Sequence, residues 1–464
     1  MARFIIHAER IGSAEIKKFI YDNQTSELLT EDGTAVEVQV PKLHIYKKDA
    51  PAVFAVSSDA PGKKGQIKTL KIALGLSCNY ECSYCSQRFV PRADETNAHD
   101  LEPFLESLEQ WLMPRIKNPD GEGLRIEFWG GEPFVYWKTL KPLAERLRTR
   151  LPKVTFNVIT NGSLLDLEKN AWLDEMGFGV GISHDGPGQH VRGPDPLQDP
   201  EKAAAIKDLF LRLRPKGRVS FNAMVNRDNQ SRAAIVKFFS ELTGDPQLQM
   251  GEGAFVDPYD EGGLASSLKP DELVAFRLNA FREVRNGSAA GMNIVKQKVS
   301  DFIESIANRR PARLVGQKCG MDRTDNIAVD LKGNVLTCQN VSAVSVAPNG
   351  EAHKIGHVSD YENIQLKTST HWSKREECPK CPVLQLCKGS CMFLEGNLWD
   401  AGCDNSFSDN IPFFAAAIEF ITGYVPVYIE GPHRRDRWDI FGLRKENVPT
   451  PKPARRVIPI KVAA

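Results

Sequence analysis

Short apolar segments alternate with longer amphipathic segments between residues 68 and 260. The apolar segments have the length of buried β-strands and comprise residues 70–76, 124–128, 154–160, 178–183, 219–225 and 253–256. The amphipathic segments repeat apolar residues at helical spacing and include residues 101–112, 140–151, 165–176 and 203–213. This alternation predicts parallel βα units, arranged either as an open (β/α)6 barrel or as a doubly wound sheet. Both folds place binding and catalytic residues at the C-terminal ends of the strands.

The N-terminal region has a different pattern. Residues 18–21 and 35–40 could pair as strands around the turn-prone Asp32-Gly33. This predicts a small β module, followed by a glycine-containing linker at residues 61–65.

The C-terminal region divides into an apolar part and a basic part. Residues 411–425 have a strongly apolar helical pattern and are predicted to form a helix that packs on the barrel. Residues 431–464 are rich in arginine and contain several prolines. Such a composition predicts an extended tail with little intrinsic fold.

The charge of the chain is nearly balanced, with 60 basic and 59 acidic residues among 464. This balance gives no broad positive surface, so neither nucleic acid nor a membrane is predicted as a partner. The apolar patch at residues 4–6 is far too short for a signal peptide, and no other segment has the length of a membrane span. We therefore expect a soluble, cytoplasmic protein.

The ten cysteines fall into two groups, at residues 78–85 and 319–403. Cys78, Cys82 and Cys85 follow the first apolar segment and would lie on the loop at the C-terminal end of a strand. Three thiols this close in a cytosolic protein suit an iron–sulfur cluster better than a disulfide framework. A four-iron cluster held by three thiolates leaves one iron open to a small molecule. The alternative is a zinc site with a fourth ligand from elsewhere in the chain.

The spacing Cys-x3-Cys-x2-Cys, with Tyr84 directly before the third cysteine, resembles the signature of radical S-adenosylmethionine (radical SAM) enzymes. The resemblance implies an α/β fold with a partial (β/α)6 TIM barrel. It also implies that the open iron binds the amino and carboxylate groups of S-adenosylmethionine. An electron donor such as flavodoxin or ferredoxin would reduce the cluster, and the resulting 5'-deoxyadenosyl radical would abstract a hydrogen atom from the substrate.

Further segments at predicted strand ends resemble family motifs that contact S-adenosylmethionine. The Gly-Gly-Glu-Pro segment at residues 130–133 is similar to the motif that holds the amino group, and its glycines would let a ligand approach the backbone closely. The segment at residues 183–187 is similar to a Ser-x-Asp-Gly-Pro motif whose serine contacts the ribose. Asn161 could bind the same sugar or the carboxylate, and Arg192 could pair with the carboxylate. The predicted cofactor-binding residues are Tyr84, Gly130, Gly131, Glu132, Asn161, Ser183, Asp185 and Arg192.

The same segments contain ordinary turn sequences. Asn161-Gly162 and Asp185-Gly186 both favour turns whether or not they bind a ligand. His184 is a proton carrier by residue type, but the sequence gives it no partner and we assign it no role. The sequence therefore identifies no catalytic acid, base or hydrogen donor.

The seven cysteines of the second group resemble the SPASM domain, which carries two auxiliary four-iron clusters. The segment 326–338 is predicted to be a hairpin with Gly333-Asn334 at positive φ in its turn, which would bring Cys338 back towards Cys319. The resemblance assigns Cys319, Cys338 and Cys391 to the nearer auxiliary cluster, and Cys378, Cys381, Cys387 and Cys403 to the farther one. Three [4Fe–4S] clusters would then use all ten cysteines, so the nearer auxiliary cluster would lack a fourth thiolate. A zinc site at residues 378–391 is the alternative.

Four regions follow from these patterns. Residues 1–65 would form an N-terminal module, which could either dock the leader of a precursor peptide as an added strand or simply cover the following barrel. The partial barrel would span residues 66–314, the SPASM domain residues 315–405, and the C-terminal helix and tail residues 406–464.

The pattern is nearest to anaerobic sulfatase maturases and to maturases of ribosomally made peptides. Sulfatase maturases typically carry an aspartate base directly after the cysteine equivalent to Cys338 and an additional cysteine on the nearer cluster, whereas this chain has Gln339 and no further cysteine. We therefore expect an enzyme that modifies a precursor peptide and forms a thioether or carbon–carbon cross-link. Epimerisation is less favoured, because no cysteine is left over as a hydrogen donor. The alternatives are a sulfatase-maturase-like enzyme, a small-molecule dehydrogenase with the same clusters and, outside enzymes, an iron–sulfur electron carrier or a zinc scaffold.

Overall fold

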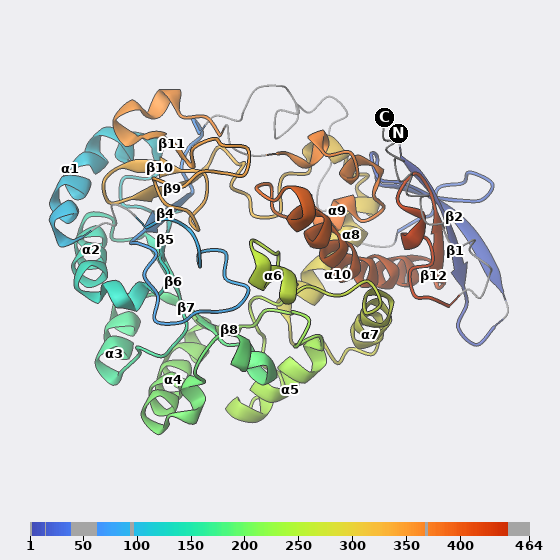
Figure 1. Cartoon of the computed structure of the whole chain (residues 1–464), viewed down its shortest axis with the longest axis horizontal. Helices are drawn as coiled ribbons and strands as arrows, with labels where there is room; N and C mark the ends of the chain where they lie inside the picture. Colours follow the sequence, from blue (N-terminus) through green and yellow to red (C-terminus); the bar gives the residue numbers. More distant parts are fainter. Residues whose placement is uncertain (1, 14, 39–62, 93–96, 367–369, 444–464) are drawn as a thin grey trace, which may run out of the picture.

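The computed structural model describes residues 2–13, 15–38, 63–92, 97–366 and 370–443. Its main body is an eight-stranded sheet in the order β11-β10-β9-β4-β5-β6-β7-β8. A four-stranded sheet lies at the other end of the molecule, and the long helix α10 (Gly396–Thr422) lies between the two (Figure 1).

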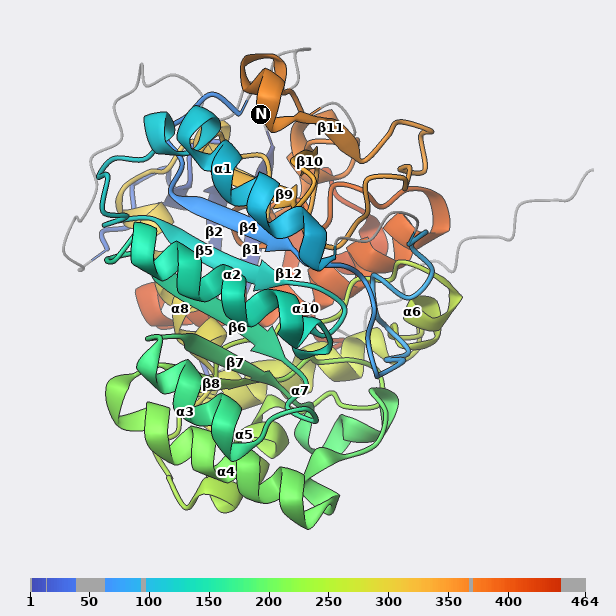
Figure 2. The same cartoon turned by 90° about the vertical axis from the view of Figure 1, so that its left-hand side faces the viewer.

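Five parallel strands form the centre of the larger sheet. They are β4 (Thr69–Ala73), β5 (Arg125–Trp129), β6 (Thr155–Thr160), β7 (Gly179–Ser183) and β8 (Val219–Asn222). Helices α1 (Leu101–Trp111), α2 (Trp137–Arg150), α3 (Leu167–Glu175) and α4 (Pro200–Leu213) cover one face of this sheet (Figure 2). The predicted alternation of strands and helices is confirmed here, and the fold is an α/β fold with a parallel sheet.

The sixth predicted strand, residues 253–256, is not a regular strand. It follows α5 (Arg232–Thr243) and makes only an isolated parallel bridge between Val225 and Phe255. Val225 N donates to Ala254 O at 3.0 Å, and Val256 N donates to Val225 O at 2.9 Å. The chain then continues through α6 (Glu261–Ala265), α7 (Leu273–Arg285) and α8 (Asn293–Ala307).

The other edge of the large sheet comes from the second cysteine region. β9 (Asn326–Asp330) pairs in parallel with β4, and β10 (Asn334–Leu336) and β11 (Lys354–His357) continue the sheet as antiparallel strands. The predicted hairpin is confirmed, but only Gly333 has a positive φ, at 80°, because Asn334 already belongs to β10. The predicted boundary at residue 315 therefore separates two regions that share one sheet.

The smaller sheet combines both ends of the chain. Its order is β12-β1-β2-β3, formed by β12 (Val425–Glu430), β1 (Arg3–Glu9), β2 (Ile16–Asp22) and β3 (Glu27–Thr30). The predicted strand at residues 18–21 lies in β2 but pairs with β1 and β3. In the other predicted strand, Ala35 makes only a bridge with Leu29, and residues 39–40 lie outside the described residues. The predicted N-terminal and C-terminal regions are therefore joined in one sheet.

The predicted linker at residues 61–65 is described only from Lys63 onwards. Lys63 is fully buried, and its ammonium group donates to the carbonyl oxygens of Met321, Arg323 and Asn326, the last two at 3.0 and 2.9 Å. This residue therefore belongs to the packed structure and fixes the loop that follows Cys319.

The predicted C-terminal tail is wrong for residues 431–443. Ile440 and Phe441 are buried, and Phe441 stacks on Phe281 of α7 with ring centroids 4.9 Å apart. Apolar residues within the basic stretch thus anchor it to the core. Residues 444–464 lie outside the described residues, so the tail prediction stays a prediction there. Within the described ranges, no helix is long and apolar enough to cross a membrane.

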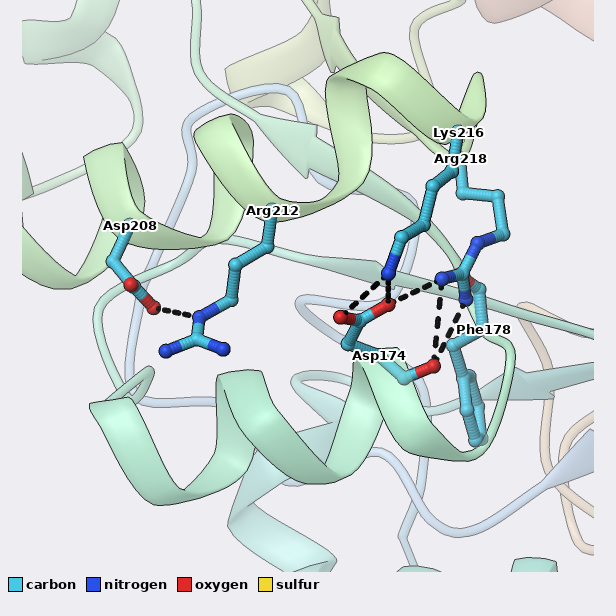
Figure 3. A network of polar contacts seen from close by, with 6 residues as sticks. All are labelled: Asp174, Phe178, Asp208, Arg212, Lys216 and Arg218. Carbon is cyan, nitrogen blue, oxygen red and sulfur yellow. Dashed lines mark hydrogen bonds and ion pairs between the residues drawn. The ribbon is translucent and has the colours of Figure 1, made fainter.

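An ion network on the surface joins α3 to the start of β8 (Figure 3). The carboxylate of Asp174 accepts two hydrogen bonds from Lys216 Nζ, at 2.5 and 2.7 Å, and pairs with Arg218. Arg218 also donates to the carbonyl oxygen of Phe178 at 3.3 Å. The hydrogen bond from Lys216 is the largest cause of the lowered pKa of Asp174. The network fixes the chain where it enters β7 and β8, whose opposite ends carry the candidate site.

Helix α10 contacts the smaller sheet through aromatic side chains. Phe414 is fully buried, and its ring centroid lies 5.6 Å from that of Tyr21 on β2 and 5.0 Å from that of Phe302 on α8. We predict that Phe414→Ala lowers the free energy of unfolding by about 3–5 kcal/mol, because it leaves a cavity in this cluster. Phe420→Ala on the same helix is the control and should cost no more than about 0.5 kcal/mol, because Phe420 is 69% exposed. Equal losses in urea unfolding would contradict the assignment of this contact.

Candidate functional site

The first cysteine loop and the C-terminal ends of the central strands enclose a cavity of about 370 Å³. Its wall contains Cys78, Cys82 and Cys85, the three predicted cluster ligands. It also contains all the predicted cofactor-binding residues except Asp185, namely Tyr84, Gly130, Gly131, Glu132, Asn161, Ser183 and Arg192. The fold therefore brings together groups that are more than a hundred residues apart in the sequence.

The three thiols have surroundings that suit a metal cluster. Burial raises the pKa of Cys78 and raises that of Cys82 to about 11. Backbone N–H groups point at two of the sulfurs, from Tyr80 to Cys78 and from Gln87 to Cys85, both at 3.4 Å. Such thiols bind metal by releasing their protons, and N–H groups stabilise the resulting thiolates.

Gly130 and Gly131 pack against the cysteine loop itself. Gly131 N donates to the carbonyl oxygen of Gly75, and the next residue along donates to that of Ser77, both at 3.0 Å. A Cβ atom on residue 131 would lie 2.5 Å from the carbonyl oxygens of Leu76 and Ser77. The sequence predicts that these glycines allow a ligand to approach the backbone. In the structure they allow the backbone segment just before Cys78 to approach closely.

The carboxylate of Glu132 joins the ends of β5 and β6. It is 1% exposed and accepts hydrogen bonds from the Thr160 hydroxyl at 2.8 Å, from Asn161 N at 2.7 Å and from Phe134 N at 3.1 Å. Burial raises its pKa, while these hydrogen bonds favour the ionised form. The side chain of Asn161 in turn donates to Oδ1 of Asn79 at 2.9 Å. Both residues therefore hold the cysteine loop in addition to lining the cavity.

A buried polar triad lies beside the third cysteine. Tyr84 Oη donates to Oδ2 of Asp185 at 2.5 Å and accepts from Nη1 of Arg192 at 2.9 Å. Oδ1 of Asp185 accepts from Met224 N at 2.9 Å. Asp185 is fully buried and does not line the cavity, so in the structure it supports Tyr84 and Arg192 from behind. Nε of Arg192 is buried without a hydrogen-bond partner among the described residues, which leaves this guanidinium with an unused donor.

His184 stabilises the turn in which it lies. Its Nδ1 accepts from Gly186 N at 3.0 Å, so the proton is on Nε2, which donates to Asp195 at 2.9 Å. Burial lowers its pKa, and its ring stacks on that of Phe238 with centroids 5.9 Å apart. The neutral imidazole of His184 makes two hydrogen bonds, which fix the turn at residues 183–187.

The four cysteines predicted to hold the farther auxiliary cluster line one small cavity. Burial raises the pKa of three of these thiols. Arg437, Trp399 and Phe407 complete much of the wall. The four cysteines are Cys378, Cys381, Cys387 and Cys403. This donor set could hold a four-iron cluster.

The three cysteines predicted for the nearer auxiliary cluster also lie near one another. Burial raises the pKa of Cys338 to about 11 and that of Cys391 to about 12, and the charge of Cys319 contributes to both shifts. This group touches the first cysteine loop, because Gln87 Nε2 donates to Asn340 Oδ1 at 3.3 Å. Among the described residues, no group of three or more His, Cys, Asp or Glu side chains is arranged to hold a single metal ion.

Several cavity residues are absent from the predicted site residues, and three of them carry ionisable side chains that lie together or follow a predicted strand. Asp257, Tyr259 and Lys318 all line the cavity, and Lys318 Nζ lies 3.2 Å from Oδ2 of Asp257. Asp257 and Tyr259 directly follow the sixth predicted strand, so the rule that ligands bind at strand ends was a usable signal for them. Lys318 carries no such signal, because it comes from the loop before β9.

A family model, the 4Fe-4S single cluster domain, matches residues 71–186. The match spans the first cysteine loop, the Gly-Gly-Glu-Pro segment and the turn after β7. It supports a 4Fe-4S cluster in this part of the chain.

Two curated proteins are similar over most of the chain. The cysteine-type anaerobic sulfatase-maturating enzyme of Clostridium perfringens is 26% identical over 343 residues, which cover 68% of this chain and 85% of that enzyme. The radical SAM cyclopropyl synthase TigE of Paramaledivibacter caminithermalis is 25% identical over 345 residues, which cover 70% of this chain and 68% of that enzyme.

A solved structure shares the fold. It is described as native anSMEcpe with bound AdoMet and the Cp18Cys peptide, and it matches with a TM-score of 0.51 and 22% identity over 76% of this chain and 99% of that chain. The predicted resemblance to radical SAM enzymes is confirmed by these similarities. The chain is thus similar to radical SAM enzymes over about two thirds of its length, and these relatives support an enzymatic activity.

The close approach of residue 131 to the cysteine loop gives a test of the site. We predict that Gly131→Ala displaces the loop, costs about 1–3 kcal/mol of stability and lowers the iron content of the reconstituted protein. Gly130→Ala is the graded control, because its Cβ would lie 2.9 Å from a single carbonyl oxygen, that of Gly75. Iron analysis and thermal unfolding should rank the wild type first and Gly131→Ala last. An unchanged iron content in Gly131→Ala would show that the packing does not position the cysteines.

Proposed function

We propose that the protein is a radical SAM maturase that acts on a peptide and forms a thioether or carbon–carbon cross-link in it. Cys78, Cys82 and Cys85 would hold a [4Fe–4S] cluster with one open iron, at which S-adenosylmethionine binds. The observation that carries this proposal is the 370 Å³ cavity, where these three thiols meet the strand-end residues of β5, β6 and β7.

The bound group would supply, on reduction by a flavodoxin or ferredoxin, a 5'-deoxyadenosyl radical that abstracts a hydrogen atom. The protein residues would bind and orient the nucleoside ligand and shield it from water. Arg192, fixed by Tyr84 and Asp185, would face the carboxylate of the nucleoside ligand. The backbone around Gly130 and Glu132 would accept from its amino group, and Ser183 and Asn161 would contact the sugar or the carboxylate. Placement within the cavity would limit the access of water to the reacting carbon.

A peptide substrate is supported by the relatives. The structural neighbour is described with a bound peptide, and a sulfatase-maturating enzyme is named for its action on another protein. The second cysteine group supports a net oxidation such as cross-linking, because two auxiliary clusters held by Cys319, Cys338 and Cys391 and by the farther four cysteines would give electrons a path away. With all ten cysteines assigned, epimerisation lacks a thiol hydrogen donor.

The predicted docking of a leader peptide as an added strand is not part of this proposal. At one edge of the smaller sheet, Val36 N already donates to Leu28 O at 2.9 Å. At the other edge, Ile429 N donates to Trp438 O at 2.9 Å. Within the described part of the chain, segments of the protein itself therefore cover both edges.

The second candidate is sulfatase-maturase-like oxidation. The 26% identity to the cysteine-type enzyme over 85% of its length favours it. Against it, the position after Cys338 holds Gln339, a buried amide that accepts from the Cys338 thiol at 3.6 Å and cannot serve as a base. Asp257 supplies an aspartate carboxylate in the cavity wall, but this carboxylate already pairs with Lys318 and accepts a hydrogen bond from the Ser390 hydroxyl.

The cluster assignment predicts a stepwise iron count. Anaerobically reconstituted wild type should hold about twelve irons per chain, and the Cys78, Cys82, Cys85 triple alanine variant about eight. With S-adenosylmethionine and dithionite, the wild type should form 5'-deoxyadenosine and the variant none. Equal formation by both proteins would remove the radical proposal, and about four irons in the wild type would remove the auxiliary clusters.

The substrate proposal predicts a distinct product. A precursor peptide encoded beside the gene should lose a pair of hydrogen atoms on incubation with the loaded enzyme, and tandem mass spectrometry should find fragments held together by the new bond. A sulfatase-derived peptide with its cysteine or serine serves as the rival substrate. Oxidation of the sulfatase peptide alone would favour the second candidate over the first.

A further inference from the structure

A buried guanidinium from the C-terminal segment lies against the farther cysteines. Arg437 is 2% exposed and lines their cavity. Its Nη2 donates to Sγ of Cys403 at 3.4 Å and to Oδ1 of Asp404 at 2.6 Å. Its Cζ lies 4.7 Å from the ring centre of Phe407. The guanidinium is therefore held in place next to a sulfur.

Other cations surround the same cysteines. Arg375 lies with Cζ 3.6 Å from the ring centre of Trp399, and its charge interacts with Cys378 and Cys403. The charges of Lys298 and Lys318 interact with Cys387. In the part of the chain that the structure describes, Arg437 differs from these groups because it also donates a hydrogen bond to a sulfur.

We propose that Arg437 raises the reduction potential of the cluster held by Cys378, Cys381, Cys387 and Cys403, and thereby makes this cluster the electron acceptor of the reaction. The inference rests on the proposed function. Reduction adds negative charge to a cluster, so a nearby cation and an N–H···S hydrogen bond both favour the reduced form. The burial of Arg437 strengthens this effect, because little water screens its charge.

Cross-linking requires an acceptor for one electron, and the farther cluster would be this acceptor. The peptide loses one hydrogen atom to the deoxyadenosyl radical, which becomes 5'-deoxyadenosine. When the new bond forms, the product radical loses one electron and one proton. The electron enters the oxidised farther cluster, the proton passes to water, and a one-electron carrier protein such as ferredoxin or flavodoxin re-oxidises the cluster.

The test is a redox titration of the full-length, reconstituted protein, followed by electron paramagnetic resonance. The Cys78, Cys82, Cys85 triple alanine background removes the first cluster, and Cys403→Ala identifies the signal of the farther one. In this background we compare Arg437→Gln, Arg437→Lys and the control Arg434→Gln. Arg434 also pairs with Asp404, at 3.0 Å, but is partly exposed and donates to no cysteine in the part of the chain that the structure describes.

Arg437→Gln should lower the ratio of reduced to oxidised farther cluster about tenfold at a fixed potential, which corresponds to about 59 mV for one electron. Arg437→Lys should lie between Arg437→Gln and the wild type, and Arg434→Gln should match the wild type. An unchanged ratio in Arg437→Gln with an unchanged iron content would overturn the proposal. So would loss of about four irons in both Arg437 variants, because Arg437 would then be a structural clamp. These readouts need no turnover, so failure to form 5'-deoxyadenosine in the wild type would refute the proposed function separately.

Discussion

The close contact between the cysteine loop and the backbone after β5 determines the geometry of the candidate site. The backbone N–H groups of Gly131 and Glu132 donate to the carbonyl oxygens of Gly75 and Ser77, both at 3.0 Å, and a side chain at residue 131 would collide with two carbonyl oxygens. Only glycine permits this approach. Because the loop is tied down just before Cys78, its three thiols face the strand ends. The buried carboxylate of Glu132 and the amide of Asn161 extend the same attachment to β6.

The two ends of the chain complete the molecule around the second cysteine group. β12 pairs with β1, and the segment that follows it carries Arg437 into the cavity of the farther cysteines. Lys63, just before β4, fixes the loop after Cys319. The β9–β10 hairpin extends the larger, mostly parallel sheet and brings Cys338 towards Cys319. The sites predicted for three clusters therefore belong to one continuous structure, in which the first cysteine loop touches the second group through Gln87 and Asn340.

Sequence periodicity was sufficient for the centre of the fold. Buried parallel strands and amphipathic helices have strong local patterns, so β4 to β8 and α1 to α4 could be predicted with small errors at their ends. The sixth strand could not, because residues 253–256 have the apolar pattern of a strand but form only one bridge to Val225. The pairing of β1 with β12 could not be predicted either, since it joins segments at opposite ends of the sequence. At residues 431–443 the composition predicted an extended tail, but burial of a few apolar side chains anchors this arginine-rich segment to the core.

In the candidate site, too, some features could be predicted from local sequence and others depend on contacts between distant segments. The three cysteines of the first loop and the strand-end motifs were visible in the sequence, because each follows a predicted strand. The support that Asp185 gives to Tyr84 and Arg192 depends on three-dimensional contact and has no sequence signal. The same is true of Arg437 and Lys318, which reach their cavities from segments outside the β-strands and α-helices. The resemblance to radical SAM enzymes supplied the chemistry, and the structure supplied the neighbours of each group.

The central claim is that Cys78, Cys82 and Cys85 leave one iron open towards the cavity. The most direct measurement is electron–nuclear double resonance on the reduced protein with S-adenosylmethionine labelled at its amino nitrogen and carboxylate oxygen. Our account predicts hyperfine coupling from both labels to the first cluster, and no coupling in the triple alanine variant. Absence of coupling in a wild type that holds the first cluster, or zinc in place of iron at these cysteines, would contradict it.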